Sequence, residues 1–74
     1  MTDELRRTWG ANIRGIRVAH GMTQGTLAEQ VGVTKATVSR WEAGLIAPRD
    51  AMKVAIAEAL NVDVRVLFPL VRAR

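Results

Sequence analysis

The connection between two neighbouring helices constrains this chain more than any other feature. Thr23 and Thr34 are good N-cap residues, and Gly32 and Gly44 are placed to end the helices that these threonines begin. Only Gly32, Val33 and Thr34 connect the two helices. A connection this short does not let the helices lie antiparallel, so they must cross at a steep angle. The sequence therefore predicts a helix-turn-helix.

The apolar positions of the two helices are those that such a crossing has to bury. Leu27, Ala28 and Val31 share the inner face of the first helix. Val38 and Trp41 share the inner face of the second helix. Because Ala28 is small, the two helices can approach each other closely at that position.

Two longer helices are predicted on either side of this pair. Apolar residues such as Trp9 recur at intervals of three and four over residues 3–19, which predicts an amphipathic helix. Pro48 cannot continue the second helix of the motif, and we expect Asp50 to cap a further helix. Asn61 can adopt the left-handed conformation that ends that helix.

The last apolar segment, residues 62–68, is ambiguous by pattern alone. It alternates like a half-buried strand, but nothing else in the chain can pair with it in a sheet. We therefore predict a short fifth helix that is capped by Asp63 and ended by Pro69. The apolar residues on one face of this helix are Val64, Leu67 and Phe68.

Together these segments predict an all-α fold, a compact five-helix domain in which the second and third helices form the helix-turn-helix. We expect a single domain over residues 1–74, with a core over 5–68 and a short C-terminal tail over 69–74. A domain of this size buries only about 60% of its unfolded surface, so a partner subunit would help to stabilise it. No separate oligomerisation domain is expected, so a dimer would form through the domain itself.

Composition argues against most catalytic and metal-binding chemistry. The chain has no cysteine and a single histidine, His20, so neither thiolate chemistry nor a histidine cluster for a metal is expected. The carboxylates are scattered, and no serine has the partners of a catalytic triad. We therefore expect a protein that is not an enzyme and that needs no cofactor, metal or small-molecule ligand. His20 is expected to cap the carbonyl end of the first helix.

The charge balance indicates a polyanionic partner. Eleven Lys and Arg residues against seven Asp and Glu residues give a net charge of +4, which favours nucleic acid. No stretch approaches the roughly 20 apolar residues that span a bilayer. The first four residues lack the layout of a signal peptide. We expect a cytoplasmic protein.

The outer face of the second motif helix carries hydrogen-bonding side chains and no carboxylate. A helix is narrow enough to enter the major groove of DNA, where Lys and Arg donate to guanine O6 and N7 and Thr contacts base edges. Without the surrounding motif, the same residues would also fit an ordinary solvated face. The residues on this outer face are Lys35, Ala36, Thr37, Ser39 and Arg40.

Several short motifs between residues 23 and 44 match a family pattern. They are Thr23-Gln24, Leu27-Ala28, Gly32-Val33-Thr34, Val38-Ser39, and Trp41-Glu42 followed by Gly44. Through these motifs the chain resembles the Cro and lambda-repressor-like (XRE) family of helix-turn-helix DNA-binding proteins. The likeness covers residues 5–68 and implies a lambda-repressor-like arrangement of five helices.

The resemblance implies roles for individual residues. The residues expected to contact DNA bases are Thr34, Lys35, Ala36, Thr37 and Arg40. The residues expected to contact the DNA backbone are Thr23, Gln24, Ser39 and Arg49. Arg17 and Glu42 match a pair that forms an internal salt bridge in relatives, so their expected role is structural.

The chain departs from the family pattern between Gly44 and Pro48. Relatives often place Lys or Arg there against the DNA backbone, whereas this chain has Leu45, Ile46 and Ala47. Leu45 and Ile46 either pack inward or meet a partner. The arginines that can take over phosphate contacts are Arg6, Arg7, Arg14 and Arg49.

The expected function is sequence-specific regulation of transcription by a dimeric repressor of the phage-repressor or Cro type, which binds an inverted-repeat operator in double-stranded DNA. Surplus apolar residues near the C-terminus predict the homodimer interface. The residues expected in it are Val64, Leu67, Phe68 and Leu70. An alternative is an antitoxin-like protein-interaction module with autoregulatory DNA binding. Only six residues follow Phe68, which argues against a long toxin-binding segment.

Overall fold

The computed structural model describes residues 2–70, and within them it contains five helices and no strand. The prediction of an all-α fold is confirmed, and the ambiguous last segment is a helix. The expected tail lies outside the described residues beyond position 70. The helices are α1 (Asp3–Ala19), α2 (Gln24–Val31), α3 (Lys35–Glu42), α4 (Asp50–Leu60) and α5 (Val64–Leu67).

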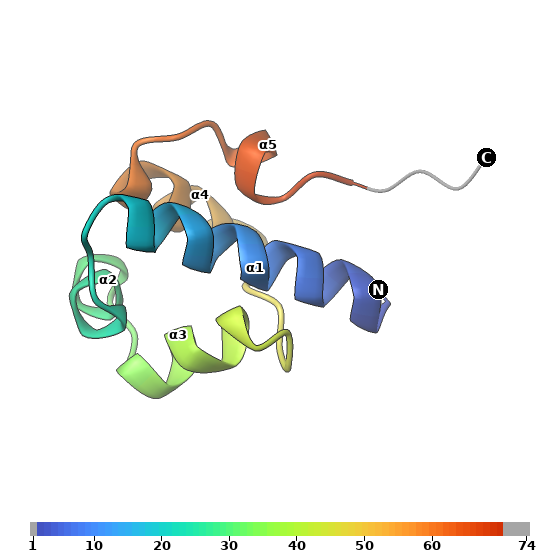
Figure 1. Ribbon diagram of the computed structural model, residues 1–74, viewed down its shortest axis with the longest axis horizontal. Coiled ribbons are helices and arrows are strands. Elements are labelled where there is room, and N and C mark those ends of the chain that lie inside the picture. The colour runs from blue at the N-terminus through green and yellow to red at the C-terminus, as the bar shows by residue number, and fades with distance from the viewer. Residues whose placement is uncertain (1, 71–74) are drawn as a thin grey trace.

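Helix α1 lies in the middle of the arrangement, with α3 on one side and α5 on the other (Figure 1). Helix α2 packs against α3 and α4, and α4 also packs against α5. None of the described helices has the length and apolar character that crossing a bilayer requires. The buried apolar core consists of Trp9, Ile13, Leu27, Ala28, Val38, Trp41, Ile56, Ala57, Leu60, Leu67 and Phe68.

The predicted caps fix both helices of the motif. Thr23 Oγ1 accepts a hydrogen bond from the Thr26 amide at 3.0 Å. Thr34 Oγ1 accepts one from the Thr37 amide at 3.2 Å. Gly32 ends α2 in the left-handed conformation, with φ at +79°, which a residue without Cβ adopts at little cost. The capping interactions that the sequence predicts for this motif are confirmed.

Helix α4 begins one position earlier than the sequence predicted. Arg49 is the N-cap residue, with an extended backbone and no capping hydrogen bond from its side chain. Asp50 was expected to be the cap, but it has already entered the helix as its first residue. Its carboxylate there accepts a hydrogen bond from Lys53 Nζ at 3.2 Å and suits the positive end of the helix dipole. Asn61 ends the helix at a φ of 57°, as predicted.

Two glycines let α1 approach the end of α3. A Cβ on Gly10 would lie 2.7 Å from the Glu42 carbonyl oxygen and closer still to the Trp41 carbonyl oxygen. A Cβ on Gly44 would lie 2.7 Å from Arg7 Cγ, and Gly44 also has a positive φ of 76°. Any side chain at these positions would push α1 away from α3.

Helix α5 and the residues after it are fastened to α1. Asn12 Nδ2 donates to the Leu67 carbonyl at 3.0 Å, and Trp9 Nε1 donates to the Pro69 carbonyl at 2.9 Å. The ring of Phe68 meets the ring of Trp9 edge to face, with 5.5 Å between centroids. These contacts place the rings of Trp9 and Phe68 together in the core.

The same packing corrects the predicted dimer interface. Leu67 and Phe68 are only 0% and 6% exposed, because both side chains fill the core beneath α5. Neither is available to a second subunit, so the prediction that placed them in the interface is wrong. Val64 is half-buried against the core, whereas Leu70 is 73% exposed.

Candidate nucleic-acid interface

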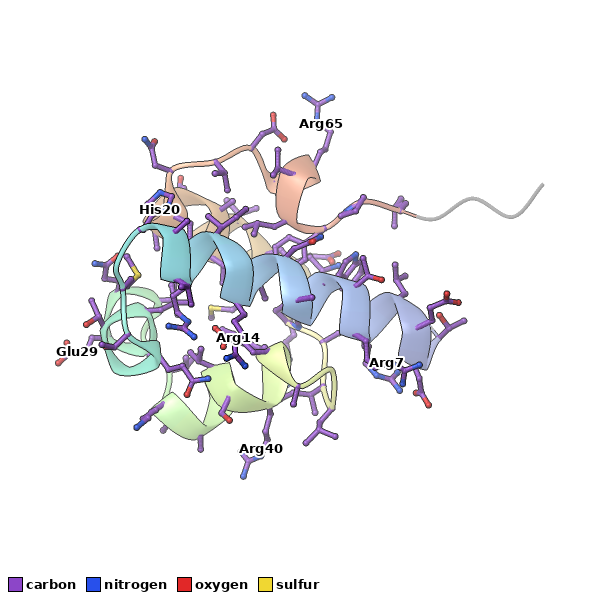
Figure 2. The ribbon with its side chains drawn as sticks, viewed as in Figure 1. Arg7, Arg14, His20, Glu29, Arg40 and Arg65 are labelled. Atoms are coloured by element: carbon purple, nitrogen blue, oxygen red, sulfur yellow. The ribbon has the colours of Figure 1, made fainter. Side chains whose placement is uncertain are left out.

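Helix α3 has one face in the core and the other in solvent. Val38 and Trp41 are 0% and 3% exposed and anchor the helix on the core. Figure 2 shows Arg40 pointing away from the body of the protein. The exposed residues of the outer face are Lys35, Ala36, Ser39 and Arg40. This division gives a rigid helix with a polar, acid-free surface of the kind that fits the major groove.

Thr34 and Thr37 are also predicted to contact bases, but their hydroxyl groups already take part in hydrogen bonds within the protein. Thr34 Oγ1 is occupied as the cap of α3 and lies 3.0 Å from Thr37 Oγ1. Thr37 is half-buried and lines a hollow of about 430 Å³ between α3 and the start of α4. Lys35, Ala36 and Arg40 are exposed, and their side chains make no hydrogen bond within residues 2–70, so they are the freest of the residues predicted to contact bases.

The N-terminus of α2 opens onto a second hollow of about 630 Å³. Thr23, Gln24 and Gly25 line this hollow from the start of α2, and Lys35 lines it from the start of α3. Free amides at a helix N-terminus attract anions, and a lysine beside them adds to that attraction. The structure thus brings Thr23 and Gln24, two of the predicted backbone-contacting residues, together with Lys35.

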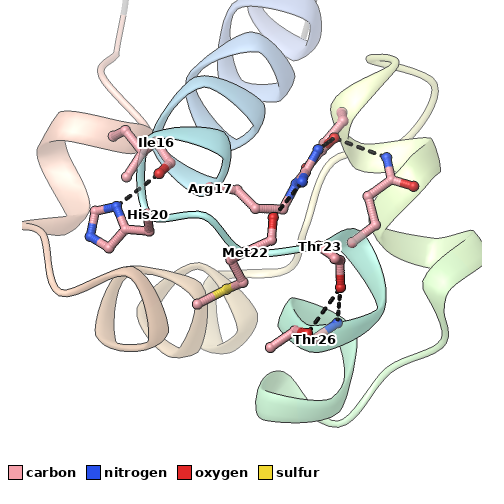
Figure 3. Close-up of polar contacts among 8 residues, drawn as sticks. Ile16, Arg17, His20, Met22, Thr23 and Thr26 are labelled. Carbon is pink, nitrogen blue, oxygen red and sulfur yellow. Dashed lines mark hydrogen bonds and ion pairs between the residues drawn. The ribbon is translucent and has the colours of Figure 1, made fainter.

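A buried ionic network ties α1 to the motif (Figure 3). Arg17 Nε and Nη2 donate to the two carboxylate oxygens of Glu42 at 2.6 and 3.0 Å. Arg17 Nη1 also donates to the Met22 carbonyl at 2.7 Å. The side chains of Arg17 and Glu42 are 11% and 4% exposed. The predicted structural salt bridge is confirmed.

This network also affects the pKa of Arg17 and the orientation of Gln24. The hydrogen bond with Glu42 raises the pKa of Arg17, against the opposing effect of its burial. Gln24 Nε2 donates to Glu42 Oε1 at 2.9 Å. An amide nitrogen carries two hydrogens, so one remains for a phosphate. The sequence does not reveal this link, because residues 18 positions apart meet only through the crossing of the helices.

The residues at the edges of the site include His20, Leu45, Ile46 and Arg49. His20 Nδ1 lies 2.8 Å from the Ile16 carbonyl at the end of α1, so the predicted capping role is confirmed (Figure 3). Leu45 and Ile46 are 69% and 41% exposed, so they do not pack inward. Arg49 is exposed beside the hollow that Thr37 lines. Among the described residues, no cluster of three or more acidic or histidine side chains could hold a metal ion.

Comparison with known proteins places this geometry among regulators. The family model described as helix-turn-helix (HTH_3) matches residues 13–67. The P22 c2 repressor, solved in complex with synthetic operator 9T, is 28% identical with a TM-score of 0.79, and the match covers 82% of this chain and 92% of that chain. The restriction-modification controller protein C.AhdI from Aeromonas hydrophila is 29% identical with a TM-score of 0.84, over 89% and 96% of the two chains.

A third similar structure is the clp gene regulator ClgR from C. glutamicum. It is 28% identical with a TM-score of 0.80, and the match covers 85% of this chain and 82% of that chain. A search of curated protein sequences finds no match.

Proposed function

This chain belongs to the helix-turn-helix (HTH_3) family, and we propose that it is a sequence-specific regulator of transcription that binds double-stranded DNA through the major groove. The observation that carries the proposal is the acid-free outer face of α3, held rigidly by Val38 and Trp41. The similarity to the P22 c2 repressor, whose structure contains operator DNA, supports it. The resemblance to Cro and lambda-repressor-like proteins agrees with this family.

In this proposal the exposed side chains of α3 recognise bases. Arg40 and Lys35 have the reach and the donors to bind guanine O6 and N7, and the small Ala36 lets the helix approach the base edges. Thr34 and Thr37 are secondary contacts, since their hydroxyl groups already bond each other. The residues proposed to hold the DNA backbone are Thr23, Gln24, Ser39 and Arg49.

We further propose that the protein acts as a homodimeric repressor, with a corrected interface. Leu67 and Phe68 point into the core, so the apolar residue on the outward side of α5 is Val66, which is 55% exposed. Val66 and the exposed Leu70 take the place of Leu67 and Phe68, with Val64 at the edge. A two-fold dimer presents its recognition helices to half-sites about 34 Å apart, so the operator is an imperfect inverted repeat.

Selection of bound sites from random duplex DNA tests this proposal. The expected product is an inverted repeat with half-sites one helical turn apart. Selection that returns only single, unpaired half-sites would contradict the dimer, and selection without enrichment would contradict sequence-specific binding.

Two substitutions then separate base contacts from backbone contacts. Arg40→Ala should cost about 1–3 kcal/mol on the selected site and relax preference at one position per half-site. Gln24→Ala should weaken all DNA sequences alike, since a phosphate contact carries no base information. Equal losses on selected and random DNA for Arg40→Ala would reassign Arg40 to phosphate.

A further inference from the structure

We propose that the DNA-binding surface extends beyond the helix-turn-helix onto α1, where Arg7 and Arg14 bind phosphates of the DNA backbone. This inference rests on the proposed function, because it names an additional part of the same DNA-binding surface. The sequence offers these arginines as candidates for phosphate contacts but does not say on which side of the molecule they lie. The packing of α1 assigns them.

The packing of α1 against α3 determines the side on which these two arginines lie. Residues at spacings of three, four and seven share one side of a helix, so Arg7, Gly10, Arg14 and Arg17 form a single row. Gly10 touches the carbonyl groups at the end of α3, and Arg17 bonds Glu42 of α3. Arg7 and Arg14 therefore lie on the side of α1 next to α3, and both are exposed (Figure 2).

Neither arginine has a partner within the described part of the protein. Arg14 makes no hydrogen bond or ion pair with any residue between 2 and 70. Arg7 packs its aliphatic stem against Gly44 and likewise lacks an acidic partner in that range. Arg6 differs, since its side chain pairs with Asp3 and donates to the Gly44 carbonyl at 3.3 Å. Arg6 is thus already committed, whereas Arg7 and Arg14 are free to meet an anion.

The described cations on the α5 side of the molecule are paired with carboxylates, whereas most of those on the α3 side are not. On the side of α5, Arg65 is paired with Asp63 and Lys53 with Asp50, and the Lys53 ammonium also lies 4.2 Å from the Trp9 ring centroid. The cations without an acidic partner among residues 2–70 are Arg7, Arg14, Lys35, Arg40 and Arg49. Figure 2 shows Arg7, Arg14 and Arg40 on the same side as α3, with Arg65 on the opposite side. This sorting concentrates positive potential where the proposed function requires it.

The two arginines also continue a path that starts at the N-terminus of α2. Val18 lines the hollow that Gln24 and Lys35 share, and Arg14 lies one helical turn before Val18 on α1. Arg7 follows two turns further on, about 10 Å from Arg14 at 1.5 Å per residue. Phosphates of one strand recur every 3.4 Å along the duplex axis, so two cations about 10 Å apart can both reach phosphates of the same strand. One strand can therefore pass from the hollow over Arg14 to Arg7.

This path compensates for the apolar turn after α3. Leu45 and Ile46 are exposed in this turn, and they offer no charge to a phosphate. Arg7 contacts Gly44 at the start of that turn, so its guanidinium replaces the missing charge from the neighbouring helix.

The test compares three glutamine variants of the full chain that change the net charge equally. Arg14→Gln and Arg7→Gln remove the proposed phosphate contacts, and Arg65→Gln is the matched control on the opposite side. Binding to a mixed-sequence DNA duplex is measured by fluorescence anisotropy over a series of salt concentrations. Circular dichroism verifies that each variant is folded. Arg14 has no partner among the described residues, so Arg14→Gln should fold normally. This variant tests the proposal even if Arg7→Gln folds poorly.

Each phosphate contact that is lost should reduce the slope of log K against log salt by about 0.9 per bound subunit. The affinity at low salt should fall by about two- to fivefold, which is the range of an exposed ion pair. Arg65→Gln should keep the wild-type slope. If Arg14→Gln and Arg7→Gln behave like Arg65→Gln, the extension onto α1 is overturned and the proposed function stands. If folded wild-type protein binds no duplex at all, both proposals are overturned.

Discussion

Replacing Glu42 with alanine removes the acceptor that holds three helices together. The carboxylate accepts two hydrogen bonds from Arg17 of α1 and one from Gln24 of α2, at distances between 2.6 and 3.0 Å. In Glu42→Ala the guanidinium of Arg17 keeps only the Met22 carbonyl, at a site where its side chain is 11% exposed. A buried charge without its counter-ion is the expected source of instability.

The magnitude follows from the burial of both partners. Removing one partner of a buried ion pair costs about 3–5 kcal/mol. A chain of 74 residues has a total stability of about 4–11 kcal/mol, at 0.05–0.15 kcal/mol per residue. The variant is therefore expected to lose a large part of its stability. The melting temperature should fall by about 12–40 °C, since 1 kcal/mol corresponds to about 4–8 °C in a domain of this size.

Urea unfolding followed by the fluorescence of Trp9 and Trp41 measures this loss. Glu58→Ala is the control, because Glu58 is an exposed carboxylate without an ion pair in the described structure, and its loss should stay within about 0.5 kcal/mol. The double variant Arg17→Met with Glu42→Leu should recover most of the stability, since apolar residues of similar size often replace a buried pair without loss. If Glu42→Ala unfolds at the wild-type urea concentration, the ionic network does not stabilise the fold.

Four further substitutions test the packing and the caps. Phe68→Asp buries a charge in the core, so it should lower the free energy of unfolding by more than the roughly 3–5 kcal/mol of a Phe→Ala change. A thermal melt like that of the wild type would contradict the burial of Phe68. Gly10→Ala should destabilise the fold, because its Cβ would overlap the carbonyl groups at the end of α3. Gly15→Ala has open space around its Cβ and should stabilise the fold by about 0.5–1 kcal/mol. Urea unfolding measures both variants, and equal effects would refute the close approach of α1 to α3. The side chain and amide of Arg65 lower the pKa of Asp63 from 3.8 to about 2, so the carboxylate should stabilise α5 above pH 3.8, and this stabilisation should be lost as the pH falls toward 2. Asp63→Asn should show a flatter loss of helix signal by circular dichroism in that range, and an unchanged acid profile would argue against the cap.

Sequence by itself determined the helices and their ends. Thr23 and Thr34 cap helices through amides three residues away, and Gly32 ends α2 through its own backbone conformation. Such interactions are local, so they can be recognised in a short stretch of sequence. The boundary of α4 was missed by one position, because an aspartate suits both the N-cap and the first turn of a helix, and the sequence does not distinguish the two places.

Only the tertiary structure decided how the side chains of neighbouring helices meet. Glu42 accepts from Gln24 only because α2 and α3 cross at a fixed angle, and that angle depends on packing contacts between residues far apart in sequence. Periodicity places Leu67 and Phe68 on one face of α5 but does not say whether that face meets the core or a partner. Because α5 docks on α1, this face is turned toward the core. Likewise, Arg6 and Arg7 are adjacent in sequence, but the packing of α1 gives only Arg6 a hydrogen bond to the Gly44 carbonyl, and Arg7 has no acidic partner among residues 2–70. The cause is common to all three cases, since the orientation of a helix about its own axis is set by the surfaces it packs against.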